Sequence, residues 1–300
     1  MLPEEKRQLR ALIGSLQYAA VHTRPDMASR LSFLQSQVPH ATVETLQEAN
    51  RILHEAKRHH DVSLVVQPIP LKDVRFLAFS DASFASAKCK DSHAGCIILT
   101  AHQSIASNVP SAVSPISWSS RKIQKVVTST LSAEAVALNG VLDQLSWLRL
   151  YWGWLGDNRV QWKHPREALS LLPPSITTAR GPEESCADLA SSIAATDCKS
   201  LFDLVTKNAP PNCSEFRTQL HARAIKDLLT EGVQMRWVHS GAQLADALTK
   251  LMTTQFLRET LQVGRYCLND EDSILKQRSD RRARVRWLHQ STSESSEKNS

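Results

Sequence analysis

The chain has 300 residues, of which 42% are hydrophobic and 22% charged, with a formal net charge of +6. These values are typical of a globular protein with one sizeable core and a smaller module. No apolar run approaches the roughly 18 residues that a membrane span needs, and the N-terminus lacks the apolar segment of a secretory signal. We therefore expect an intracellular protein, cytoplasmic or nuclear, with no membrane partner. The basic balance is compatible with a polyanionic partner but does not by itself require one.

The cysteines give no sign of a cross-linked or zinc-binding protein. None of them forms a C-x-x-C pair, and a disulfide framework is unusual at this chain length. We expect free thiols that fill core positions. The six residues are Cys89, Cys96, Cys186, Cys198, Cys213 and Cys267.

Residues 1–60 predict a helical segment. Apolar residues recur at helical spacing from Pro3 to about Lys57, which indicates three helices. The first two are separated at Thr23 to Asp26, because Pro25 suits the first turn of a helix and its polar neighbours can accept hydrogen bonds from free backbone N–H groups. The segment has no strands of its own, which is typical of the remnant of a larger domain.

Residues 62–255 predict an α/β domain. The runs VSLVV, VRFLAFSDA, AGCIILTA and VSPISW have the composition of strands, and turn residues separate them. An apolar stripe along residues 128–155 then predicts a long amphipathic helix that covers the sheet.

A polar loop at 156–188 is expected after that helix. The strand SSIAATDC, a helix over 215–230, the strand VQMRWVHS and a closing helix over 242–251 follow it. This order predicts a mixed sheet with helices on its faces. Residues 270–300 are basic and serine-rich, which predicts a disordered tail.

Two aspartates end matching strands. Asp81 ends the apolar run VRFLAFSD, and Asp197 ends SSIAATD. If these strands are parallel neighbours, both carboxylates emerge at the same edge of the sheet. Neighbouring strands lie about 4.8 Å apart, and two carboxylates that close repel each other. A divalent cation bound between them is the usual way to offset that repulsion.

Two further acids can reach the same edge. Glu134 lies within the apolar stripe of the long helix, so its carboxylate should face the sheet and needs a cation or strong donors there. Asp246 lies just after the strand that ends near His239. Four carboxylates would form an all-oxygen site of the kind that suits Mg²⁺ or Mn²⁺. Taken singly, each acid is more simply a turn, a cap or an ion-pair residue, so the set carries the argument.

Five sequence blocks resemble, in order, copia-type retrotransposon Pol polyproteins at the end of the reverse transcriptase and the following ribonuclease H domain. They are LRALIGSLQYAAVHTRPDMA, AFSDASFA, ISWSSRKIQKVVTSTLSAEAVAL, ATDCKS and WVHSGAQLADALTK. The chain departs from that pattern at Phe84, where Trp is usual, and at Ala135, where Tyr is common. Both departures concern packing, not metal chemistry.

The resemblance implies a five-stranded ribonuclease H fold and endonucleolytic cleavage of the RNA strand of RNA:DNA hybrids with two Mg²⁺ or Mn²⁺ ions. It assigns Asp81, Glu134, Asp197 and Asp246 to the metal ligands. It implies as partners the hybrid and the remainder of a Pol polyprotein. The polymerase Asp-Asp motif is not in the sequence, so no polymerase activity is expected.

The resemblance also suggests residues around the acids. His239 is similar to a mobile histidine that precedes the last acid in some ribonucleases H, while a solvent-facing loop histidine is the plain alternative. Arg121, Lys122 and Lys125 follow the Trp118 strand and can contact hybrid phosphates, although a solvated turn accounts for them nearly as well.

Two other functions remain open. A transposase or integrase of the same fold carries its Glu last, whereas the Glu here comes second and an Asp comes last. The stronger alternative is a catalytically inactive retrotransposon remnant that acts at most as a nucleic-acid-binding module.

Overall fold

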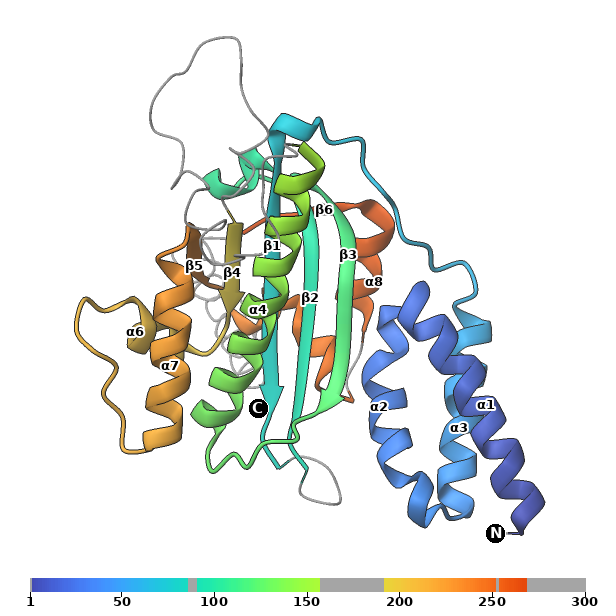
Figure 1. Ribbon diagram of the computed structural model, residues 1–300. Coiled ribbons are helices and arrows are strands. Elements are labelled where there is room, and N and C mark those ends of the chain that lie inside the picture. The colour runs from blue at the N-terminus through green and yellow to red at the C-terminus, as the bar shows by residue number, and fades with distance from the viewer. Residues whose placement is uncertain (1, 86–90, 157–191, 252–253, 269–300) are drawn as a thin grey trace, which may run out of the picture.

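The structure is a computed structural model that describes residues 2–85, 91–156, 192–251 and 254–268, the side chains of 154–156 excepted. Figure 1 shows a central sheet with helices on both faces and a bundle of three N-terminal helices beside one edge. The expected loop beyond residue 156 and the expected tail at 270–300 lie outside the described residues, as do Cys89 and Cys186.

The sheet is mixed and has the order β5-β4-β1-β2-β3-β6. Strands β1, β2 and β3 form an antiparallel meander, while β4 runs parallel to β1, and β5 runs parallel to β4. The expected α/β fold class with a mixed sheet is therefore confirmed. The strands are β1 (Val74–Ser83), β2 (His93–His102), β3 (Ser111–Lys122), β4 (Ser192–Thr196), β5 (Val233–Trp237) and β6 (Arg265–Tyr266).

Two strand expectations need correction. Among the described residues the sheet has six strands and not five, because the two-residue β6 pairs with the start of β3 at the edge. The run VSLVV at 62–66 is not a strand. Within it only Val65 donates a backbone hydrogen bond outside the local chain, to Leu261 O at 3.1 Å.

Alternate residues of β1 build two hydrophobic cores on opposite faces of the sheet. Phe76 and Ala78 pack with apolar residues of α4, α6 and α7. Leu77 and Phe79 pack with residues of η7 and α8 on the other face. Because successive side chains of a strand point to opposite faces of the sheet, this central strand is buried on both sides. The helices are α4 (Thr130–Gly156), α6 (Lys199–Thr206), α7 (Phe216–Leu229), η7 (Leu244–Leu248) and α8 (Gln255–Val263).

The closing segment differs from the expected helix over 242–251. It consists of two short 3-10 helices, η6 (Ser240–Ala242) and η7, and the last α-helix is α8. Helix α6 was not expected either. Asp246 therefore lies in a 3-10 turn that packs against the sheet, and not in the first turn of an α-helix.

The N-terminal helices have their own core and also contact the sheet. Their buried residues include Leu9, Leu31 and Ile52. The indole Nε1 of Trp118 on β3 donates to Ala20 O at 2.7 Å, and the ring of Phe33 lies 3.9 Å from that of His93 on β2. The helices are α1 (Pro3–His22), α2 (Ala28–Gln37) and α3 (Val43–Arg58).

The described residues also bear on cross-links and membranes. Cys96, Cys198, Cys213 and Cys267 are free thiols, and Cys96 is buried. Within the described ranges, no helix combines the length and the apolar character needed to cross a bilayer.

Candidate metal centre

Three carboxylates converge at one edge of the sheet. Asp81, Asp197 and Asp246 each offer one oxygen, and these oxygens all lie within 4.8 Å of one another. They come from β1, from the turn after β4 and from η7, so separate parts of the chain supply them. Asp81 is 2% exposed, and the other two are half-buried.

The parallel pairing of β1 with β4 explains two of these positions. Phe79 lies opposite Ala195 in the register, so two residues further along each strand Asp81 comes opposite Asp197. The strand β5 then fixes the turn, because Nε1 of Trp237 donates to Asp197 O at 3.0 Å. The pattern of one acid at the end of each neighbouring strand therefore places both side chains together.

The third acid is held by contacts between η7 and the sheet. The buried side chain of Gln243 donates from Nε2 to Ser80 O at 3.0 Å, directly before Asp81 in the chain. The close approach of η7 to β2 requires a glycine at position 95, because a Cβ there would lie 2.7 Å from Leu248 Cβ. Gly95 is the residue of β2 that pairs with Asp81. These contacts bring Asp246 against the carboxyl half of β1.

Glu134 approaches from the opposite face of the sheet, on α4. Glu134 is 5% exposed, the Ala82 backbone N–H donates to its carboxylate, and its Oε2 has no hydrogen-bond partner. It is not among the oxygens grouped within 4.8 Å. Burial, followed by the charges of Asp81 and Asp197, raises the pKa of Glu134 to about 9. Those charge interactions place Glu134 within electrostatic reach of the cluster.

The other acids are also perturbed. Burial raises the pKa of Asp81 to about 7, with a contribution from Asp246, although Lys250 and a hydrogen bond from Thr249 Oγ1 oppose the shift. Burial likewise raises the pKa of Asp246 despite Lys250, whose Nζ lies 2.5 Å from Asp246 Oδ1. The same ammonium lies 3.6 Å from Asp81 Oδ2. One lysine therefore does not offset the burial of these carboxylates.

This donor set fits a divalent cation. It offers carboxylate oxygens from several directions, which is the chemistry that Mg²⁺ and Mn²⁺ prefer. The unpartnered Oε2 of Glu134 is a second sign, because a buried carboxyl oxygen without a donor is costly unless a cation meets it.

We predict that replacing Glu134 by Gln changes how the stability of the metal-free protein depends on pH. The folded-state pKa is about 9, above its ordinary 4.5, so ionisation costs more free energy in the folded state. The wild-type free energy of unfolding should therefore fall as pH rises from about 4.5 to 9, and the variant should lack this part of the fall. In EDTA, urea denaturation should find the variant more stable at pH 9 by on the order of 2 kcal/mol. A difference that is equal at pH 5.5 and pH 9 would contradict the raised pKa.

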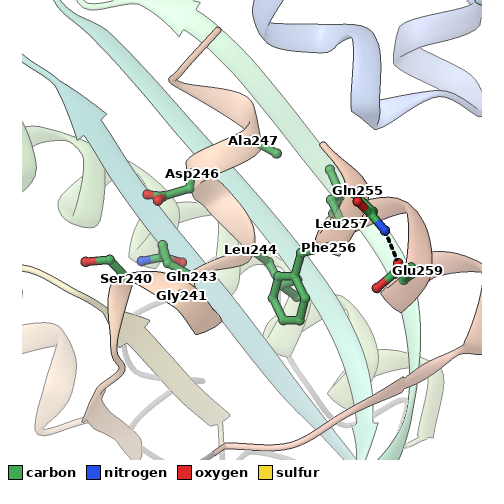
Figure 2. Close-up of a pocket in the computed structure, with 10 residues that line it drawn as sticks. All are labelled: Ser240, Gly241, Gln243, Leu244, Asp246, Ala247, Gln255, Phe256, Leu257 and Glu259. Carbon is green, nitrogen blue, oxygen red and sulfur yellow. Dashed lines mark hydrogen bonds between the residues drawn. The ribbon is translucent and has the colours of Figure 1, made fainter. Parts of the chain in front are cut away.

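His239 lies at the start of η6, just beyond the carboxyl end of β5. Its Nδ1 accepts a hydrogen bond from Gly241 N at 3.0 Å, so the ring caps the short helix. It is not among the residues that line the adjacent pocket of about 320 Å³ between η6, η7 and α8. Figure 2 shows the Asp246 carboxylate on one side of that pocket, pointing away from the apolar side chains of Leu244 and Phe256.

The three basic residues are exposed near the end of β3. Lys122 Nζ lies 2.8 Å from Asp91 Oδ1, and Arg121 donates to Ser119 Oγ at 3.2 Å. Together with Lys125 they line a trough of about 280 Å³ between the strands β2 and β3 and the helix α4. The trough lies on the α4 face of the sheet, from which Glu134 also reaches the site.

Three site residues were not assigned a role from the sequence: Gln243, Thr249 and Lys250. All belong to the block WVHSGAQLADALTK, but a side chain that fixes a turn leaves no periodic signal. The spacing of four residues between Asp246 and Lys250 was the one available indication, since such a pair meets on one face of a helical turn.

The comparisons with known proteins concern the fold. No protein-family profile matches the chain, and no curated protein sequence matches it. The structure is similar to the N-terminal ribonuclease H domain of Rv2228c from Mycobacterium tuberculosis, at 12% identity and a TM-score of 0.35, over 62% of this chain and 97% of that chain. Ribonuclease H1 from Halobacterium salinarum gives 12% identity and a TM-score of 0.34, over 58% of this chain and 93% of that chain.

A third similar structure is a foamy viral protease-reverse transcriptase in complex with an RNA/DNA hybrid. Its identity is 11% and its TM-score 0.32, over 62% of this chain and 21% of that chain.

Proposed function

We propose that this chain is a ribonuclease-H-type endonuclease that hydrolyses the RNA strand of RNA:DNA hybrids. The observation that carries the proposal is the convergence of Asp81, Asp197 and Asp246 within 4.8 Å at the end of two parallel strands, with buried Glu134 beside them. A cluster of buried and half-buried carboxylates that one lysine does not compensate destabilises a fold, which indicates a functional reason for it.

The proposed ligands of the metal are Asp81, Glu134, Asp197 and Asp246. When bound, two Mg²⁺ or Mn²⁺ ions would supply Lewis acidity, which activates a water and stabilises the leaving 3′ oxygen. The three aspartates orient their oxygens from rigid elements, and Glu134 holds a proton on its carboxyl group until a cation favours its ionised form. The products would carry 5′-phosphate and 3′-hydroxyl ends.

Other residues have proposed roles toward the hybrid. Arg121, Lys122 and Lys125 would contact phosphates along the trough on the α4 face. His239 would assist proton or product transfer after leaving its hydrogen bond with Gly241.

The sequence resemblance supports an origin for the chain. We propose that residues 1–60 correspond to the end of a copia-type reverse transcriptase and that residues 62–255, continued by α8 and β6, form the nuclease domain. The remainder of a Pol polyprotein is the proposed protein partner.

The test is cleavage of a duplex with separate labels on its two strands. With Mg²⁺ or Mn²⁺, the full chain should cut the RNA strand of an RNA:DNA hybrid, leave the DNA strand intact and leave DNA:DNA duplexes uncut. EDTA should abolish the reaction. Hybrid binding without cleavage by a folded sample, in either metal, would overturn the nuclease and favour the inactive binding module.

A further inference from the structure

Lys250 occupies the position that a cation would take between two of the acids. Its Nζ lies 2.5 Å from Asp246 Oδ1 and 3.6 Å from Asp81 Oδ2. Thr249 Oγ1 donates to the same Asp81 Oδ2. The Thr-Lys pair after η7 therefore meets two of the three converging carboxylates with donors from the chain itself.

The ammonium and a divalent ion compete for the same oxygens. Each oxygen in the contact has few lone-pair directions, and the ammonium takes one of them on Asp246 Oδ1 at 2.5 Å, from where its charge repels an incoming divalent ion. The ammonium contacts Asp246 Oδ1 at 2.5 Å and Asp81 Oδ2 at 3.6 Å, so a divalent ion that binds both aspartates has to displace it.

The side chain can leave without moving the backbone. The backbone of Lys250 is held at both ends, since its N–H donates to Asp246 O at 3.0 Å and its carbonyl accepts from Ser29 Oγ at 3.4 Å. The side chain itself is 37% exposed, so rotation about its flexible stem carries the ammonium to water. The segment that presents Asp246 keeps its place during that rotation.

We propose that Lys250 is a resident counter-ion of the metal-free site, exchanged for the metal when the site loads. Its ammonium compensates Asp81 and Asp246 in the metal-free protein, and metal binding displaces it into solvent. The buried Oε2 of Glu134 has no hydrogen-bond partner, so this fourth proposed ligand is open to the incoming cation. The inference rests on the proposed function, because it assumes a divalent ion at these carboxylates.

The direct test measures the chemical accessibility of the Lys250 amine. The full chain in EDTA, and then in increasing Mg²⁺, is pulsed with an acetylating reagent and each lysine is quantified by mass spectrometry. Acetylation of Lys250 should rise several-fold, with the same half-saturation as Mg²⁺ binding by calorimetry. Exposed Lys72 serves as the internal control and should not change. A rate at Lys250 that is unchanged or lower in the metal-bound protein overturns the inference.

Substitution provides the second test. Lys250→Met should bind Mn²⁺ roughly tenfold more tightly than wild type, because no ammonium has to be displaced. The same variant should unfold at lower urea in EDTA, since two acids lose their counter-charge. Lys72→Met removes the same formal charge and should change neither result. Equal Mn²⁺ affinities of Lys250→Met and Lys72→Met, with both variants folded by circular dichroism, overturn the exchange.

Hybrid cleavage in the same preparation separates this inference from the proposed function. If metal binds and Lys250 is exchanged but the hybrid is not cleaved, the proposed nuclease function is wrong and the proposed exchange is supported. If the hybrid is cleaved but metal does not change the acetylation rate of Lys250, only the proposed exchange is wrong. If neither wild type nor Lys250→Met binds Mg²⁺ or Mn²⁺ at millimolar concentration, both are wrong.

Discussion

Replacing Asp81 by Asn is expected to lower the rate of hybrid cleavage on the order of a thousandfold. Asp81 is the most buried of the three converging aspartates and accepts the hydrogen bond of Thr249. Asn has nearly the same shape and can still accept that bond, so the substitution removes the charged oxygen while the packing stays. The measurement is the single-turnover cleavage rate in Mg²⁺ and in Mn²⁺.

The same substitution should stabilise the metal-free protein. The pKa of Asp81 is about 7 in the fold and 3.8 in its ordinary state, so its ionised form destabilises the fold as pH rises through that interval. At pH 8 in EDTA, the Asn variant should gain about 1–2 kcal/mol in the free energy of unfolding, with Lys250 limiting the gain. Loss of activity together with higher stability distinguishes a ligand from a residue that merely supports the fold.

Asp227→Asn is the matched control for Asp81. Asp227 lies on α7, its side chain is 63% exposed, and its partner is Arg223 in an ion pair at the helix surface. Because exposed pairs contribute little, neither activity nor stability should change measurably. If Asp81→Asn cleaves the hybrid as fast as this control does, Asp81 is not a ligand of the catalytic metal.

The positions of the site residues followed from sequence where periodicity carried the information. Asp81 and Asp197 end two apolar strands, and Glu134 lies in the stripe of an amphipathic helix, so alternation and helical spacing indicated the edge and the face. Gln243 and Thr249 act through hydrogen bonds across the chain, to Ser80 O and to Asp81 Oδ2. Such contacts depend on the tertiary structure and leave no pattern in one sequence.

The errors in the fold also have physical causes. The run VSLVV has the composition of a strand, but Pro68 and Pro70 follow it closely and cannot donate to a ladder, so it does not extend into the sheet. The expected helix over 242–251 is replaced by two 3-10 turns. Its residues Leu244, Ala245, Ala247 and Leu248 are buried all around the turn and are not confined to one stripe. The end of helix α8 could have been predicted from Gly264, because glycine readily takes the left-handed conformation that ends this helix, with φ of 64°.

Replacing Asp26 by Ala is expected to destabilise the whole protein by about 3–5 kcal/mol. Its side chain is fully buried between two guanidinium groups. Arg24 donates to it from Nε at 2.8 Å and from Nη2 at 2.9 Å, and Arg258 of α8 donates from Nε at 2.8 Å. Burial alone would raise the pKa of Asp26, but these bonds hold it below its ordinary value. The wild-type network should therefore stabilise the fold above pH 4 and weaken as pH falls through that lowered pKa.

The ion pairs of Asp26 and Arg258 decide whether the N-terminal helices unfold separately from the sheet. Arg258 joins Asp26 to Glu55 of α3, with its Nη2 at 2.7 Å from Glu55 Oε1, so α8 is bonded to two parts of the helical segment. Urea denaturation followed by far-UV circular dichroism and by tryptophan fluorescence should give one coincident transition for wild type. In a double-mutant cycle, Asp26→Ala and Arg258→Met should cost less together than the sum of the single costs, because each leaves the other's charge buried. Two separate wild-type transitions, or strictly additive costs, would mean that residues 1–60 are an independent module that merely touches the sheet. A single transition with strong coupling would make the helical segment a structural part of the domain that carries the metal site.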